Sequence, residues 1–357
     1  MSSIVEDSGG IFAQHHMKKI VSYAFIILLI IGGIGSWLLY SCIFKDNLKD
    51  TDTGSYELFV KSCWNYDSLN QAIQPIVLNI NSFNRVADQM NLTNNVRPGL
   101  YLFSDSLSNR DLISKLRLGQ TEAVKVILTG SLNRNQILPK ITEYLEVDST
   151  ELIDLMNDKN YLDSLGYTAE NWPCLFVANT YFFNWATTAD EVVSRFVKEH
   201  NSFWNDDRRQ QATALGLGPK EVVVLASIVD AETMMDSELP MIAGVYLNRL
   251  QQHWPLGADP TIRYLIHEQG RQRVLYVDLE IESPYNTYKN LGLPPGPILL
   301  PSVKAIDAVL NAASTEYMFF CAKADFSGYH AFAKTNAQHE RNRTAYRREL
   351  NRRGIMR

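Results

Sequence analysis

The chain has 357 residues, of which 46% are hydrophobic and 20% are charged. Such a length corresponds to about two or three domains, and the composition excludes an intrinsically disordered protein. The 34 basic and 39 acidic residues leave a net charge of −5, which excludes a general nucleic-acid binder. Four cysteines are too few for a disulfide scaffold, and without a C-x-x-C pair they do not indicate a zinc site.

An uncharged and mostly apolar segment occupies residues 20–44. At ~1.5 Å per residue this segment makes a helix of roughly 37 Å, which is enough to cross a ~30 Å hydrocarbon core. A buried core helix rarely runs so far without a charge, and the apolar part of a cleaved signal peptide usually has only about 7–15 residues. Trp37 and Tyr40 lie near one end, as interfacial anchors do. We therefore predict a transmembrane anchor over residues 20–44.

The flanking charges predict the orientation of this anchor. Lys18 and Lys19 precede it, whereas the lysines and aspartates just after it roughly cancel. By the positive-inside rule, residues 1–19 form a cytoplasmic tail, and everything after the anchor is exported. Residues 45–54 are polar and are predicted to be a linker.

The cysteines allow two interpretations. Cys42 lies within the predicted anchor, which leaves Cys63, Cys174 and Cys321 in the exported part. An odd number of thiols in an oxidising compartment allows at most one internal disulfide and leaves one thiol over. Three buried free thiols are an equally good interpretation.

Residues 55–128 alternate short apolar runs with helical patterns, which indicates a small α+β module. Ser108 is typical of an N-cap for a helix over residues 109–118, and Gly119 is typical of the residue that ends one. The following section, residues 132–218, is helix-rich. Apolar residues at three- and four-residue spacing predict helices over residues 133–145, 149–157 and 190–203.

The aromatic run over residues 181–185 has two interpretations, a platform on which sugars stack or the edge of a core, and core edges are the commoner case. Further along, the patterns predict helices over residues 221–235, 240–253 and 305–313, and a hairpin of strands over residues 317–322 and 329–333. The predicted fold class is therefore α+β, with one transmembrane helix, the small module, and a mixed α/β domain over residues 129–340.

The C-terminal residues 341–357 hold seven arginines and one glutamate. We predict a separate basic tail here. Charge runs of this kind are usually solvated helix ends, and the alternative is a segment that pairs with an anionic wall polymer or lipid.

Glu232 is the carboxyl group that stands out on physical grounds. It follows a mostly apolar helical run, so it is expected at the edge of a buried segment. Desolvation there would raise its pKa, and a general acid needs a raised pKa to hold a proton at neutral pH. The alternative is an ordinary solvated or capping glutamate. Asp230 points to a different helical face and is the weaker candidate.

Nothing else in the sequence completes a familiar site. Ordinary glycoside hydrolysis needs two carboxylates, and Asp236, Glu238 and Asp259 are equal candidates for the second one. The sequence contains no nucleophile elbow, H-E-x-x-H, P-loop or G-x-G-x-x-G motif. His330 and His339 are a weak pair for a metal, and we predict neither a metal nor a cofactor.

The C-terminal half resembles the MltG/YceG-like family of membrane-anchored endolytic murein transglycosylases. The matching stretches are LASIVDAET at 225–233, GVYLNRL at 244–250, DPT at 259–261, YNTY at 285–288, GLPPGPI at 292–298 and HAF at 330–332. A weaker similarity upstream, around residues 97–119, resembles the small LysM-like domain of the family and assigns that role to residues 55–128. Ala231, Gly257 and Ala258 depart from the usual pattern of the family, and Glu232 does not.

The resemblance implies cleavage, without water, of the β-1,4 bond between N-acetylmuramic acid (MurNAc) and N-acetylglucosamine (GlcNAc) in nascent peptidoglycan strands, with Glu232 as the lone catalytic residue. A 1,6-anhydro end would result. The residues that we expect to bind substrate are Thr233, Asn248, Tyr285, Asn286, Thr287, Tyr288 and His330.

The implied partners are peptidoglycan, the membrane and the synthases of the elongation machinery, and nucleic acid is not among them. The implied location is the bacterial cell (inner) membrane, crossed once, with the catalytic domain exported. Two alternatives stay open at this point. One is a non-catalytic peptidoglycan-binding scaffold for the synthases, and the other is a two-carboxylate muramidase.

Overall fold

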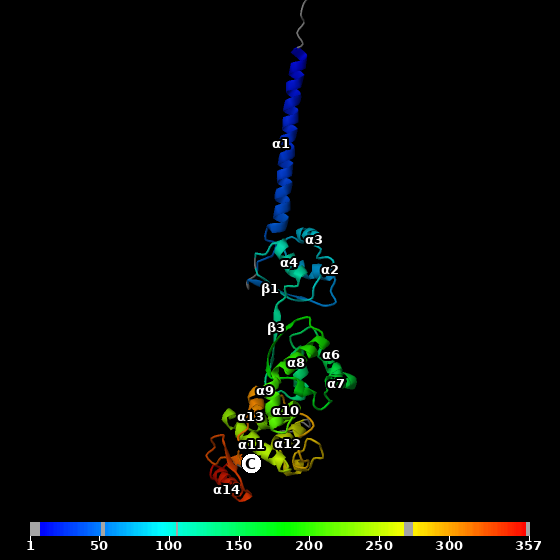
Figure 1. Cartoon of the computed structure of the whole chain (residues 1–357). Helices are drawn as coiled ribbons and strands as arrows, with labels where there is room; N and C mark the ends of the chain where they lie inside the picture. Colours follow the sequence, from blue (N-terminus) through cyan, green and yellow to red (C-terminus); the bar gives the residue numbers. More distant parts are fainter. Residues whose placement is uncertain (1–7, 51–53, 105, 268–273, 355–357) are drawn as a thin grey trace, which may run out of the picture. The chain divides into compact units, whose positions relative to one another are not determined.

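The computed structural model describes residues 8–50, 54–104, 106–267 and 274–354 (Figure 1). The chain divides into two compact units. The first extends to residue 123 and includes residues 184–186, and the second comprises residues 124–183 and 187–357. Both units mix helices with short strand pairs, which confirms the predicted α+β class.

The first unit begins with a long apolar helix. Its elements are α1 (Ser8–Phe44), β1 (Ser55–Val60), α2 (Tyr66–Ile73), α3 (Ile80–Gln89), β2 (Gly99–Ser104) and α4 (Asn109–Leu118). Within α1, the segment Lys19–Phe44 is long and apolar enough to cross a membrane, and none of its most apolar window is buried. This segment matches the predicted anchor in position and length.

A small core holds the rest of the first unit together. Strands β1 and β2 pair antiparallel, with Val60 opposite Gly99. Tyr101 and Phe103 of β2 are fully buried, and their rings stack at a centroid distance of 6.2 Å. Helix α4 begins and ends as predicted, because Ser108 accepts from the backbone of Asp111, and Gly119 adopts a left-handed conformation with φ of 67°.

The start of the predicted linker over residues 45–54 is folded in the structure. Asp46 and Leu48 form isolated β-bridges to Ser108 and Val77, and the Leu48 side chain is buried. The buried Asn47 amide donates to Asn109 Oδ1 at 2.6 Å. Residues 46–48 therefore belong to the folded unit, because their polar backbone groups find partners inside it.

The second unit carries the other elements. They are β3 (Ala123–Leu128), α5 (Arg134–Thr142), α6 (Ser149–Leu155), α7 (Lys159–Leu165), η1 (Trp172–Leu175), β4 (Asn179–Asn184), α8 (Ala189–Phe203), α9 (Asp206–Ala214), α10 (Pro219–Glu232), η2 (Asp236–Glu238), α11 (Leu239–Gln251), α12 (Asp259–His267), η3 (Tyr276–Glu280), α13 (Val303–Leu310), β5 (Phe319–Ala322), β6 (His330–Ala333) and α14 (Asn336–Arg352).

Helix α10 is the centre of this second core. Every residue from Val222 to Val229 is buried, since the helix is apolar on all sides and packs against α11, α12 and α13. Ser227 is the one polar residue in this buried stretch, and its hydroxyl makes two hydrogen bonds. Ser227 Oγ donates to the Val224 carbonyl and accepts from the backbone of Ile298. The helix ends at Glu232, three residues earlier than predicted.

The predicted hairpin is confirmed as β5 and β6, with Phe320 opposite Phe332. The aromatic run at residues 181–185 lies partly in β4, a strand that we did not predict within this helix-rich section. Tyr181 and Phe183 point into the core, and Phe182 is exposed. The core-edge interpretation of this run is therefore the correct one for its two buried rings.

Close packing of α11 against α13 depends on Gly244. A Cβ atom built there would lie 2.5 Å from the carbonyl oxygen of Ala313, whose backbone amide donates to the Pro240 carbonyl at 2.9 Å. We predict that Gly244→Ala lowers the free energy of unfolding by about 1–3 kcal/mol, because the helix and the Ala313 turn must separate. Urea denaturation of the purified chain measures this change, and unchanged stability would contradict the packing described.

Candidate active site

A cleft of about 1070 Å³ opens in the second unit at the C-terminal end of α10. Its wall is formed by four helices, two strands and the loop that carries Tyr288. The helices are α10, α11, α12 and α14, and the strands are β5 and β6. Its charged and aromatic lining comprises Glu232, Tyr246, Arg249, Asp259, Arg263, Tyr276, Tyr288, Phe320, His330, His339, Arg343, Tyr346 and Arg347.

Glu232 is the last residue of α10, since the following Thr233 is extended with φ of −143° and ψ of 148°. Its carboxyl group is partly accessible in the cleft wall but is surrounded mainly by protein atoms. This burial raises the pKa of Glu232. A hydrogen bond from Tyr246 opposes the shift, Asp259 adds to it, and Arg263 and His330 oppose it more weakly. The carboxyl group therefore has the environment of a general acid.

Tyr246 is the residue that sequence reasoning missed. Its hydroxyl donates to Glu232 Oε1 at 2.5 Å, and its side chain is only 1% exposed. Burial first, and then the neighbouring Glu232, raise the pKa of Tyr246, so the hydroxyl stays protonated. The GVYLNRL stretch contained a signal for this residue. Tyr246 and Arg249 are three residues apart in it, so both lie on one face of α11.

Arg249 supports this wall through its backbone contacts. Its guanidinium donates to the carbonyls of Met318 and Leu256, which ties the entry of β5 to the loop before α12. Burial lowers the pKa of Arg249. The guanidinium is therefore a structural cation close to the acid rather than a freely available one.

Asp259 and Tyr288 form a second pair in the cleft. Tyr288 Oη donates to Asp259 Oδ1 at 2.5 Å, and 37% of the Tyr288 side chain is exposed. Burial and then this hydrogen bond raise the pKa of Tyr288. Among the predicted substrate-binding residues, Tyr288 and His330 are the two that line the cleft.

His330 is held in place by a buried carboxylate. Glu238 is 5% exposed, and it accepts from the backbone of His330 at 2.7 Å and contacts His330 Nδ1 at 2.8 Å. Thr233 Oγ1 donates to the same carboxylate at 3.4 Å and accepts from the backbone of Met235 at 3.0 Å. Thr233 therefore stabilises the turn after the acid, and Glu238 orients the histidine.

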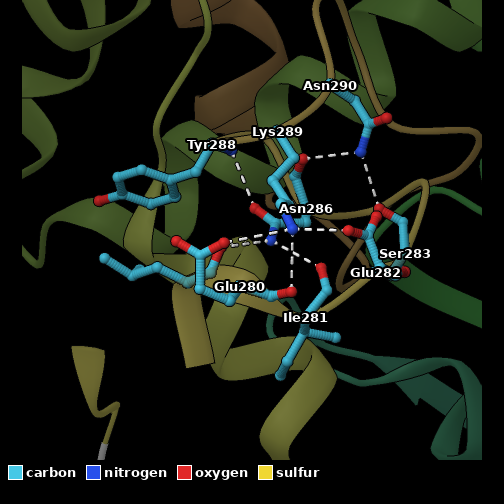
Figure 2. Close-up of polar contacts among 9 residues, drawn as sticks. Glu280, Ile281, Glu282, Ser283, Asn286, Tyr288, Lys289 and Asn290 are labelled. Carbon is cyan, nitrogen blue, oxygen red and sulfur yellow. Dashed lines mark hydrogen bonds and ion pairs between the residues drawn. The ribbon is translucent and has the colours of Figure 1, made fainter. Parts of the chain in front are cut away.

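Two of the remaining predicted residues hold the loop that carries Tyr288. The fully buried Asn286 amide donates to the carbonyls of Leu279 and Ile281, and its oxygen accepts from the backbone of Tyr288 at 3.0 Å (Figure 2). Thr287 Oγ1 accepts from the backbone of Ala258 at 2.9 Å. Both side chains are occupied inside the protein.

Asn248 and Tyr285 also lie outside the cleft lining. Asn248 donates to the carbonyls of Thr315 and Tyr317, at 2.8 and 2.9 Å, and so fixes the chain before β5. The Tyr285 ring packs against Tyr264 at a centroid distance of 4.9 Å. The structure therefore brings Glu232, Tyr288 and His330 together, and it places Thr233, Asn248, Tyr285, Asn286 and Thr287 around them.

Of the candidate second carboxylates, only Asp259 shares the cleft with Glu232. Glu238 is committed to His330, and Asp236 forms an exposed ion pair with Lys304. Asp230, on the other face of α10, accepts from the backbone and hydroxyl of Ser302 and so fixes the start of α13.

The described residues contain no group of three or more His, Cys, Asp or Glu side chains placed to hold a metal ion. The cysteines are all free thiols: Cys63 is exposed, Cys174 is buried, and Cys321 lies in the cleft wall. The interpretation of three buried free thiols therefore holds only for Cys174, because Cys63 is exposed and Cys321 is only partly buried.

The cleft therefore combines one desolvated, hydrogen-bonded carboxyl group with a charged and aromatic lining. The sequence matches the YceG-like family over residues 65–345, and the chain belongs to that family, as its motifs predict. An endolytic murein transglycosylase of Bacillus subtilis is 28% identical over 266 residues, which are 70% of this chain and 72% of that protein.

An endolytic murein transglycosylase of Streptococcus pneumoniae serotype 2 is 27% identical over 284 residues, which are 69% of this chain. The match spans only 50% of that longer relative. The crystal structure of a yceG-like protein from Listeria monocytogenes superposes with a TM-score of 0.54 at 23% identity, over 81% of this chain and 99% of that one. This last similarity supports the fold.

The raised pKa of Glu232 has a consequence for stability. Below the ordinary glutamate pKa of about 4.3 the carboxyl is protonated in both the folded and the unfolded chain. As the pH rises from there through the higher pKa of the folded state, the unfolded chain ionises more readily, and the folded state loses stability relative to it. We predict that Glu232→Gln, which cannot ionise, gains stability over the parent protein between pH 4 and pH 8. Urea denaturation of both proteins at pH 4 and pH 8 tests this prediction. A difference in the free energy of unfolding between variant and parent that is the same at both pH values would contradict it.

Proposed function

We propose that this protein is a membrane-anchored endolytic lytic transglycosylase that cleaves the MurNAc–GlcNAc β-1,4 bond of nascent peptidoglycan strands and leaves 1,6-anhydroMurNAc ends. The observation that carries the proposal is the Glu232 carboxyl, desolvated in an open cleft and hydrogen-bonded by the buried Tyr246. Membership of the YceG-like family and relatives with transglycosylase names support the same activity.

The first step is proton donation. Glu232, kept protonated by desolvation, gives its proton to the glycosidic oxygen as the bond to C1 of MurNAc breaks. Positive charge develops on that sugar ring, and the leaving GlcNAc hydroxyl is neutral. Tyr288 and the Asp259 carboxylate that accepts its hydrogen bond both line the cleft, which supports a role for them in stabilising this charge.

The second step reuses the same carboxylate. Now ionised and stabilised by the Tyr246 hydroxyl, Glu232 takes the proton from the 6-hydroxyl of MurNAc as that oxygen bonds to C1. The ring closes, and Glu232 is protonated again. Because the nucleophile belongs to the substrate, the protein needs no carboxylate to activate a water molecule.

In this proposal, the first unit holds the enzyme at the membrane and brings it to its glycan substrate. The apolar helix over residues 19–44 fits a single span of the cell membrane, with the second unit exported. The compact α+β core after it supports the LysM-like, glycan-binding role that we propose for it. A tethered enzyme meets nascent strands at a high effective concentration, close to the synthases that make them.

A two-carboxylate muramidase is the one alternative that a specific observation favours, because Asp259 lines the same cleft as Glu232. In that mechanism Asp259 would activate water or form a covalent intermediate. The hydrogen bond from Tyr288 occupies one of its oxygens, which favours a charge-stabilising role instead.

The products decide between the two mechanisms. We predict that the parent protein, given uncross-linked glycan strands, produces anhydro-muramyl ends in mass spectrometry, and that Glu232→Gln abolishes them. Asp259→Asn is the matched control, since it makes the same carboxyl-to-amide change at the other acidic residue of the cleft lining. This variant should retain the anhydro product at a lower rate. Reducing ends from the parent, or equal loss in both variants, would move the protein to the muramidases.

Tyr246 should tune the pH range of the reaction. Its hydrogen bond lowers the pKa of Glu232, so Tyr246→Phe is expected to raise that pKa further. Because the acid must be protonated, kcat/KM falls as the pH rises through this pKa. We predict that the alkaline limb of the pH profile moves to higher pH in Tyr246→Phe. A limb that stays in place would show that Tyr246 does not act through Glu232.

A further inference from the structure

The C-terminal arginine run, predicted to be a solvated tail, contributes a wall of the cleft. Within α14 the cleft-lining residues recur at three- and four-residue spacing, which places them on one face of the helix. They are His339, Arg343, Tyr346, Arg347, Leu350 and Asn351, with Gly354 beyond the helix end. The helix crosses the predicted boundary at residue 340 without interruption.

Aromatic contacts hold this face against the β5–β6 hairpin. The His339 ring stacks on Phe319 at a centroid distance of 5.2 Å, and Tyr346 packs against Phe326 at 5.3 Å. Leu350 is 8% exposed. Helix α14 is therefore a fixed part of the second unit, and its inward arginines have defined positions along the cleft.

These arginines make the cleft cationic. Four arginines line it against two carboxyl groups, and one of the two, Glu232, has a raised pKa. Arg249 is occupied by backbone carbonyls, as described above. Arg347 is exposed and makes no hydrogen bond or ion pair with the described residues, and Arg343 is 39% exposed and pairs with Glu340 on its own helix.

The charge of the whole chain makes this wall unusual. Residues 341–357 contribute +6 to a chain of −5, so the remainder carries −11 and repels an anionic polymer. The arginines on the outer side of α14 are partly neutralised, because Glu349 pairs with Arg352 and Arg353 at 2.6 and 2.7 Å. On the cleft side, Arg347 has no ion-pair partner among the described residues and Arg343 has only Glu340, so net positive charge faces the cleft, where it attracts anionic groups.

We propose that α14 forms a carboxylate-binding wall, in which Arg343 and Arg347 bind the stem-peptide carboxylates of the muramyl unit that is being cleaved. The proposal rests on the proposed function. In the proposed reaction the peptide is attached to the same sugar whose bond meets Glu232, which brings its carboxylates near this cleft. Guanidinium groups bind carboxylates in a planar, two-point geometry that suits this role.

The test compares two substrates on the full-length protein in detergent micelles. One is an uncross-linked glycan strand with intact stem peptides, and the other is the same strand after its carboxylates are converted to amides, which removes charge with little change in size. We expect the parent to favour the charged strand by at least about fivefold in kcat/KM, the effect of roughly 1 kcal/mol from two partly exposed ion pairs.

Two pairs of substitutions on the same helix, α14, test which arginines are responsible. The double variant Arg343→Gln with Arg347→Gln should erase the preference by raising KM for the charged strand. Changing the same two arginines to Glu should reverse the preference. Arg341 and Arg348, which are exposed and do not line the cleft, provide the control pair with the same changes in charge. The control pair should keep the parental preference. Circular dichroism spectra and thermal unfolding that match those of the parent show that each variant is folded.

The outcomes separate this proposal from the function on which it rests. If the parent yields anhydro ends but shows no preference, or if the cleft-face pair and the control pair behave alike, the α14 wall is overturned and the transglycosylase function stands. If the parent yields no anhydro ends from either strand, the proposed function is overturned, and this proposal with it.

Discussion

The whole site depends on the desolvation of one carboxyl group. Glu232 ends a helix that is buried on all sides, so its side chain reaches the cleft with protein around most of it. The Tyr246 hydroxyl at 2.5 Å gives the ionised form a partner without removing the desolvation. One group can then hold a proton before bond cleavage and accept one afterwards, which is the requirement of the proposed reaction.

Much of the second unit serves to hold this group and its surroundings in place. Gly244 lets the Ala313 turn approach α11, Asp230 fixes the start of α13, and Ser227 fixes the chain at Ile298. The predicted substrate residues Asn248, Asn286 and Thr287 are part of this framework, since their polar atoms bond to backbone groups. Motif residues of this kind hold the cleft wall in position.

Local signals in the sequence predicted a large part of the fold. The caps at Ser108 and Gly119, the β5–β6 hairpin and the apolar N-terminal helix follow from neighbouring residues alone. The apolar run before Glu232 predicted a desolvated carboxyl group, and burial does raise its pKa, whereas its catalytic role came from the family resemblance. The pairing of Glu238 with His330 joins residues 92 positions apart, and no local pattern encodes such contacts. The inward face of α14 was missed because a charge run without its packing partners looks solvated.

The central claim is that the substrate, and not water, supplies the nucleophile. Cleavage of glycan strands in water enriched in heavy oxygen, followed by mass spectrometry, tests it most directly. The account predicts products with 1,6-anhydro ends and no heavy oxygen from the solvent. Heavy oxygen at C1 of the new muramyl ends would contradict it, because a water molecule would then have attacked that carbon with the help of a second carboxylate.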